Sequence, residues 1–199
     1  VFEALKHGVT PEKINEITRI DRFFLCKLQK LAAYEASISS GISDDALYAR
    51  GKALGYTDAA LTRLSGTKHL PHTPCAYKTV DTCAAEFDAE TPYFYSVPGG
   101  ECEARAAKRS GKPVIVVLGS GPIRIGQGIE FDYSSVHCVW TLKAMGYDVV
   151  IVNNNPETVS TDYDTADRLY FEPLTAEDVL QIIDVEHPVG VVVAFGGQT

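Results

Sequence analysis

Two polar loops, each following an apolar run, carry the residue types that could do chemistry in this sequence. The first, Gly119 to Gly128, holds four glycines and Arg124, and the second begins at Asn153. Glycines after a strand let backbone amides approach a phosphate, and ligands of open α/β sheets bind at the carboxyl ends of the strands. Both loops would reach that edge. The polar residues that they would bring together are Arg124, Gln127, Glu130, Asp132, Asn153, Asn155, Glu157 and Thr158.

The spacing of the glycines does not fit a nucleotide site. A G-x-G-x-x-G pattern counted from Gly119 needs glycine at position 124, where Arg124 stands. The acid expected after the second strand for the ribose hydroxyls is replaced by Asn153-Asn154-Asn155. A G-x-x-x-x-G-K-[ST] motif is also missing. An oxidoreductase that uses NAD or FAD is therefore excluded, and we expect the glycines to serve either tight turns or a close approach of backbone to a ligand.

No residue pattern marks a metal centre or a catalytic nucleophile. The five cysteines include no C-x-x-C pair and are odd in number, so reduced thiols in a cytosolic protein are expected. His69 and His72 lie three residues apart without a visible third ligand. We assign no catalytic, cofactor-binding or metal-binding residue.

Composition indicates a globular protein that does not bind nucleic acid or cross a membrane. The net charge is −8, and residues from Gly111 onward carry 4 Lys and Arg against 12 Asp and Glu. Such an acidic half cannot supply the clustered cations that phosphate contacts need. No apolar run approaches the eighteen or so residues of a membrane span.

Short amphipathic helices are predicted for residues 1–66. Thr10-Pro11, Asp21, Ser43-Asp44 and Thr57-Asp58 are helix starts, because a capping side chain precedes a helical pattern. The periodicity places Ile14 and Ile17 on one face of a helix, and Phe24, Leu25 and Leu28 at helical spacing in the next.

Residues 113–199 read instead as strands alternating with helices, which predicts a parallel sheet. The expected strands are 114–118, 149–152, 169–171 and 189–195, with helices at 134–145 and after Thr175. Between the two parts, prolines break regular structure, although residues 93–95 form either a docking segment or a short strand.

The predicted fold class is therefore α + α/β. We expect a helical domain at 1–80, a linker at 81–112 and a Rossmann-like parallel α/β domain at 113–199, truncated at its C-terminus. The chain begins without Met and stops directly after a strand, so we expect a piece of a longer protein.

Several motifs together resemble carbamoyl-phosphate synthase large subunits. The resembling segments are Gly119–Tyr133, Asn153–Thr165, Leu169–Pro173 and Phe195–Thr199, preceded by Ile14–Leu25 and Val80–Phe87. The resemblance implies an oligomerisation domain followed by the pre-ATP-grasp domain of the second synthetase half. One departure is a segment, Thr67–Ala76, that is shorter than the pattern of the family.

The resemblance also implies an activity for the full enzyme. That enzyme is a ligase that makes carbamoyl phosphate from glutamine-derived ammonia, bicarbonate and two ATP, for pyrimidine and arginine biosynthesis. ATP and Mg or Mn would act in the full enzyme, and no cofactor is expected in this fragment. The implied partners are a glutamine amidotransferase small subunit or domain and other copies of the large subunit, in the cytoplasm.

Four residues are implied to line an internal tunnel that carries unstable intermediates: Arg124, Gly128, Glu130 and Glu157. A glycine at 128 would leave the bore open, and the charged side chains would hold waters and orient carbamate. The alternative for Arg124 and Glu130 is a structural ion pair at the helix start. The alternative function for the whole chain is a non-catalytic module for assembly or small-ligand binding.

Overall fold

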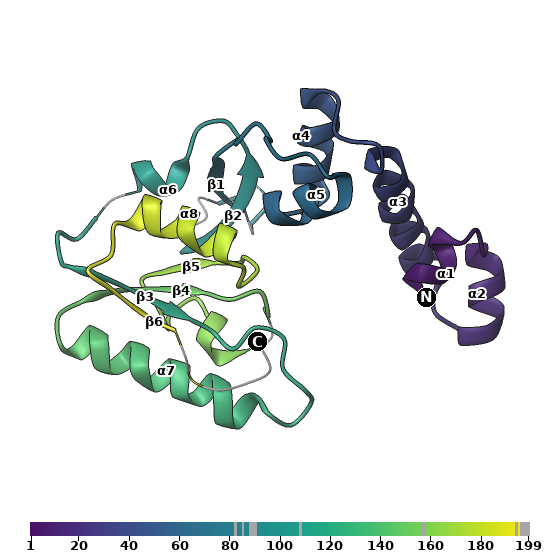
Figure 1. Ribbon diagram of the computed structural model, residues 1–199. Coiled ribbons are helices and arrows are strands. Elements are labelled where there is room, and N and C mark those ends of the chain that lie inside the picture. The colour runs from purple at the N-terminus through teal and green to yellow at the C-terminus, as the bar shows by residue number, and fades with distance from the viewer. Residues whose placement is uncertain are drawn as a thin grey trace. The chain divides into compact units, whose positions relative to one another are not determined.

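The structure is a computed structural model that describes residues 1–81, 83–84, 86–87, 91–107, 109–156, 158–193 and 195. The chain forms two compact units, Val1–Thr73 and Pro74–Thr199. The first is helical and the second holds the sheet (Figure 1).

The caps predicted from the sequence start the helices of the first unit. Thr10, Asp44 and Thr57 each accept a hydrogen bond from a backbone N–H in the first turn of the following helix. Asp21 does the same for Phe23. These bonds satisfy amide groups that a helix start leaves without partners. The helices are α1 (Phe2–Lys6), α2 (Pro11–Thr18), α3 (Arg22–Ile38), α4 (Asp45–Ala53) and α5 (Asp58–Ser65).

The long helix α3 contributes to both cores of the helical unit. Its first half packs Leu25 against Leu5 and Ile14 from α1 and α2. Its second half packs Tyr34 into a cluster with Tyr48 and Leu61 from α4 and α5, among others. The Tyr34 hydroxyl donates a 2.9 Å hydrogen bond to a backbone carbonyl of α4, which satisfies the polar end of this buried ring.

Two of the apolar residues that follow the helical periodicity lie at the surface. Ile14 is buried, but Ile17 is 72% exposed and Phe24 is 60% exposed. The helices α1 and α2 are short, so they cover only one side of the first half of α3. Ile17 and Phe24 lie outside that contact, and helical spacing alone cannot tell a covered apolar face from an uncovered one.

The described part of the second unit forms a six-stranded sheet in the order β1-β2-β5-β4-β3-β6, in which only the β1–β2 pair is antiparallel. The parallel part confirms the predicted α/β class. The elements are β1 (Cys75–Thr79), β2 (Tyr93–Pro98), α6 (Glu103–Ala106), β3 (Val114–Leu118), α7 (Gly128–Ala144), β4 (Asp148–Val152), the 3-10 helix η1 (Val159–Thr161), β5 (Arg168–Tyr170), α8 (Ala176–Glu186) and β6 (Gly190–Val192).

The first two strands lie in segments that the sequence assigned to the end of the helical domain and to the linker. The boundary between the units is at Thr73–Pro74, before β1, rather than at residue 80. Aromatic side chains explain the difference: Tyr77 and Phe94 pack on Tyr170, with ring centroids 4.9 and 5.3 Å apart. Burial of such rings holds both strands on the sheet despite the surrounding prolines.

Helix α7 covers one face of the sheet, and α8 with the short α6 covers the other (Figure 1). Alternate residues of the central strands enter the two cores: Val116 and Val150 face α8, whereas Val117 and Ile151 face α7. All residues of β4 are buried. This explains why the central strands read as continuous apolar runs.

A buried ionic cluster joins α8 to the amino ends of the strands. The Glu186 carboxylate is fully buried and accepts hydrogen bonds from Arg168 Nε at 3.1–3.2 Å, from Arg109 and from the Tyr170 hydroxyl. Burial, followed by the charge of Glu186, raises the pKa of Tyr170 and keeps it a donor. None of the helices in the described residues is long and apolar enough to cross a bilayer.

Substitution of Gly51 by Ala should destabilise the helical unit. A Cβ at this buried position of α4 would lie 2.8 Å from a methyl group of Leu61 and would also strike the Tyr34 hydroxyl. Overpacking costs about 1–3 kcal/mol, which exceeds the gain of about 1 kcal/mol in helix propensity. Thermal unfolding followed by circular dichroism should give a lower Tm, whereas Ala49→Ser at an exposed position of the same helix should cost only about 0.5 kcal/mol of helix propensity and lower the Tm less. An equal Tm for Gly51→Ala would contradict this packing.

Glu186→Gln should weaken the second unit strongly, because it removes the carboxylate charge that Arg109 and Arg168 share and leaves Arg168 only its 3.9 Å pair with Asp148. Breaking a buried ion pair costs about 3–5 kcal/mol. Asp184→Asn, on the same helix, breaks an exposed pair with Arg105 and should cost less than about 1 kcal/mol. Urea unfolding of the two variants compares them directly, and similar free energies of unfolding would rule out a structural role for the cluster.

Candidate functional site

The two polar loops start side by side at the carboxyl edge of the sheet. Strands β3 and β4 are parallel neighbours, and Leu118 pairs with Val152 at their ends. The Gly119 N–H then donates to the Val152 carbonyl at 2.8 Å, and the Asn153 N–H to the Tyr170 carbonyl at 3.0 Å. Because their strands pair, both loops lie at the edge where open α/β sheets bind ligands.

Three of the four loop glycines have a structural reason. A Cβ on Gly119 would lie 2.6 Å from the side chain of Asn153, so no larger residue fits there. The Asn153 side chain also accepts a 3.1 Å hydrogen bond from the Gly121 N–H. Gly121 and Gly126 adopt φ of 63° and 90°, which glycine tolerates best. The side chain of Asn153, rather than a phosphate, fills the space beside the first glycine.

Gly128 is the loop glycine that neither a close contact nor a positive φ requires. It is the first residue of α7, and a Cβ added there would find its nearest neighbour, a methyl group of Ile123, at 3.8 Å. Arg124 lies in the loop before it and Glu130 in the first turn of the helix, both exposed. Within the described residues no ion pair joins these two side chains. Glu157, the fourth residue of the predicted tunnel wall, lies outside the described residues.

Asp132 behaves differently from the other polar residues of this edge. It is buried in the second turn of α7, and its Oδ2 accepts a 3.1 Å hydrogen bond from the Ser160 N–H of η1. Reciprocal bonds between Thr158 and Thr161 close the same turn. Asp132 therefore ties the loop after β4 to α7. Sequence reasoning placed Asp132 at this edge, in the loop before a helix expected at 134–145, but gave no signal of its burial, because acidic side chains are usually solvated.

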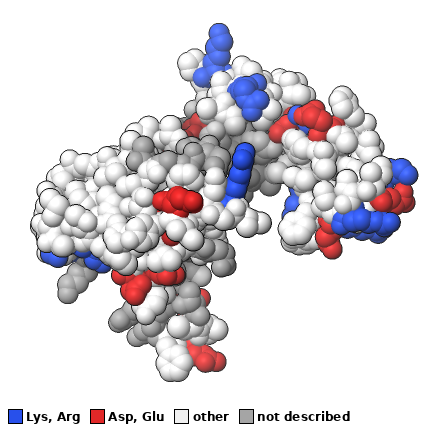
Figure 2. Space-filling view, turned by 90° about the horizontal axis from the view of Figure 1, so that it is seen from below, with Lys and Arg blue, Asp and Glu red and all other residues white. Residues whose placement is uncertain are grey.

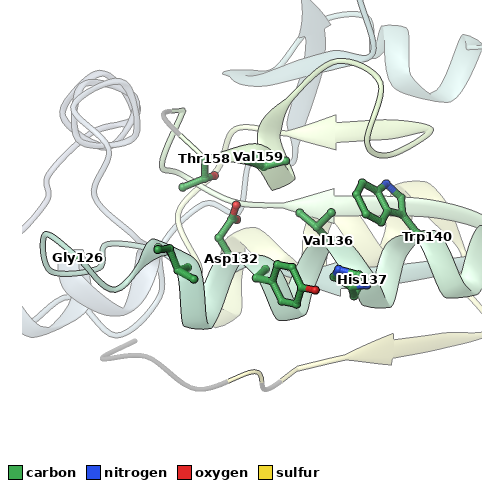
Figure 3. A pocket seen from close by; sticks show the side chains of 10 residues that line it. Gly126, Asp132, Val136, His137, Trp140, Thr158 and Val159 are labelled. Atoms are coloured by element: carbon green, nitrogen blue, oxygen red, sulfur yellow. The ribbon is translucent and has the colours of Figure 1, made fainter.

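A pocket of about 430 Å³ lies between the outer face of α7 and the start of η1 (Figure 3). Its walls are mainly apolar and aromatic. The face that carries α7 shows few charged side chains along the helix (Figure 2). The pocket is lined by Gly126, Gly128, Ile129, Asp132, Tyr133, Val136, His137, Trp140, Thr158 and Val159.

The described residues do not fit a metal or nucleotide centre. No three His, Cys, Asp or Glu side chains among them converge to hold a metal ion. The space beside Gly119, where a phosphate would approach, is taken by Asn153. The arrangement suits the passage or binding of small polar species near Gly128 and of a partly apolar ligand in the pocket.

Comparison with known proteins confirms the resemblance found in the sequence. Residues 111–199 match a family model for the carbamoyl phosphate synthase preATP-grasp domain, and residues 1–73 match one for the carbamoyl-phosphate synthetase large chain oligomerisation domain. The whole chain is 50% identical to the carbamoyl phosphate synthase large chain of Lachnoclostridium phytofermentans and spans 19% of its length. The chain therefore belongs to the carbamoyl phosphate synthase large-chain family, of which it carries an oligomerisation domain and a preATP-grasp domain.

Proposed function

We propose that this chain is part of a ligase that makes carbamoyl phosphate from glutamine-derived ammonia, bicarbonate and two ATP. Its 50% identity to a large chain of that name supports the proposal. The glutamine amidotransferase, ATP and Mg or Mn would engage other parts of the full enzyme. A cytoplasmic location fits the odd number of cysteines and the lack of a C-x-x-C pair in the sequence. The chain itself would supply a scaffold for assembly and part of an intermediate tunnel.

The open position at Gly128 is the observation that carries the tunnel role. The absence of a side chain leaves space at the N-terminus of α7, at the edge of the sheet where the two polar loops meet. A helix N-terminus attracts anions, and the exposed Arg124 adds a positive charge just before it. Carbamate is a small anion, so this end of α7 would favour its passage, while Glu130 would hold ordered water. Glu157 belongs to the same proposal through its motif.

Gly128→Phe in the full-length enzyme should slow the overall reaction but spare its partial reactions. A bulky side chain would fill the space and block transfer, so carbamoyl phosphate synthesis should fall by at least about ten-fold. Bicarbonate-dependent ATP hydrolysis and ATP synthesis from ADP and carbamoyl phosphate should persist, because neither needs passage between sites. All three rates are measured by coupled assays.

Gly128→Ala is the matched control for this experiment. Its methyl group meets Ile123 at 3.8 Å, an ordinary contact, and should leave most of the overall rate intact. Equal overall rates for the Phe variant and the wild-type enzyme would exclude a tunnel role at this position. Loss of all three rates together would indicate misfolding of the preATP-grasp domain instead of a blocked passage.

The helical unit offers a surface for self-association, here called the helical patch: Ile17, Ile20, Phe23 and Phe24. The side chains of Ile17, Phe23 and Phe24 are each more than half exposed. The two phenylalanine rings contact each other edge to face at 5.4 Å, and Lys27 lies 5.0 Å above the ring of Phe23. Exposed apolar patches of this kind mark protein contacts. The family description of this unit as an oligomerisation domain supports a second copy as the occupant.

Ile17→Asp combined with Phe24→Asp should weaken self-association by at least about ten-fold, because aromatic anchors dominate interface energies. Sedimentation equilibrium of the chain measures the dissociation constant. Val189→Asp, at an exposed apolar position of the other unit, serves as control and should not change it. An unaltered constant for the double variant would rule out the helical patch as the contact between copies.

A further inference from the structure

The pocket against α7, called the α7 pocket below, shares Gly128 with the proposed tunnel but extends along the outer face of α7 as far as Trp140, where no tunnel or assembly role is proposed. Its volume of about 430 Å³ falls in the range of small-ligand sites. Two elements build it: the outer face of α7, and the Thr158–Val159 segment that leads into η1 (Figure 3). The hydrogen bond between Asp132 and Ser160 fixes these elements against each other, so the pocket is preformed.

A buried carboxylate oxygen without a partner lies at the wall of this pocket. Asp132 is only 5% exposed, and its carboxylate points toward the Thr158–Val159 segment (Figure 3). Its Oδ2 is occupied by the Ser160 N–H, but Oδ1 accepts no hydrogen bond from any residue in the part of the chain that the structure describes. A buried acceptor left unsatisfied costs free energy that a donor supplied by a ligand would recover.

Aromatic rings line the pocket on the same face of α7. Tyr133 and His137 have ring centroids 4.1 Å apart, and His137 and Trp140 lie 5.2 Å apart. Tyr133 and Trp140 are both more than half exposed, so their faces are open to a ligand. Aromatic faces attract cations and apolar groups alike. Val136 and Val159 complete an apolar wall.

We propose that the α7 pocket binds a small organic cation, namely a primary amine or guanidinium carried on an apolar or aromatic stem. The cationic group would donate to Asp132 Oδ1, and the stem would lie against Tyr133, Trp140 and Val159. A carboxylate in a pocket lined by aromatic rings favours binding of a cationic ligand and disfavours an anionic one. Residues 74–199 also carry a net negative charge, with 8 Lys and Arg against 18 Asp and Glu, which attracts cations to this unit.

Trp140 makes the proposal directly testable, because it is the single tryptophan of the sequence and lines the pocket. The 199-residue chain is titrated at neutral pH with 2-phenylethylamine, with its neutral analogue 2-phenylethanol and with phenylacetate, while Trp140 fluorescence and the indole N–H resonance are followed. The amine should saturate both signals and bind at least about ten-fold more tightly than the alcohol. Phenylacetate should bind more weakly than the alcohol.

Asp132→Asn tests the role of the charge, since the amide oxygen can still accept the Ser160 N–H. This variant should lose the preference for amine over alcohol, whereas Glu101→Gln, at an exposed acid of the same unit, should retain it. Tyr133→Ala should weaken binding of the amine by several-fold. This variant decides the question if circular dichroism shows that Asp132→Asn unfolds. Equal binding of amine and alcohol by the wild-type chain, or no saturable signal with any probe, would overturn the proposal.

Discussion

The parallel pairing of β3 with β4 is the constraint on which the second unit depends. The two strands pair along their whole length, from Val114 with Asp148 to Leu118 with Val152, between two helical layers. A slip of one residue would turn the side chains of both cores to the wrong faces, so the register is fixed by burial. The same register decides where the two polar loops begin.

The contact between Gly119 and Asn153 carries this constraint into the loops. The two residues follow directly after paired strands, and they approach so closely that a methyl group would not fit between them. Asn153 then holds the Gly121 N–H, which directs the loop toward the start of α7. The glycine-rich loop resembles a nucleotide-binding loop, but the Asn153 side chain of the neighbouring loop occupies the space where a phosphate would bind. The open space lies further along, at Gly128.

Helix α7 contributes residues to three parts of the second unit. Val139 on its inner side packs into the sheet core, Gly128 forms its N-terminus, and Tyr133 and Trp140 on its outer side face the α7 pocket. A helix that is apolar on both sides needs something on each side to cover it. The sheet covers the inner side, and the proposed ligand covers part of the outer side. Asp132 connects the two, because it is buried at the boundary and clamps η1.

The sequence by itself determined the local features and the family. Capping side chains, apolar runs and motif spacing depend on neighbouring residues, so helix starts such as Thr10 and strands such as β3 followed from them. Tertiary structure decided which apolar faces are covered, because that depends on residues distant in the chain. It left Ile17 and Phe24 exposed, drew β1 and β2 into the sheet through contacts with Tyr170, and buried Asp132 beneath η1. Each of these outcomes depends on packing between segments that are far apart in the sequence, so no local sequence pattern predicts it.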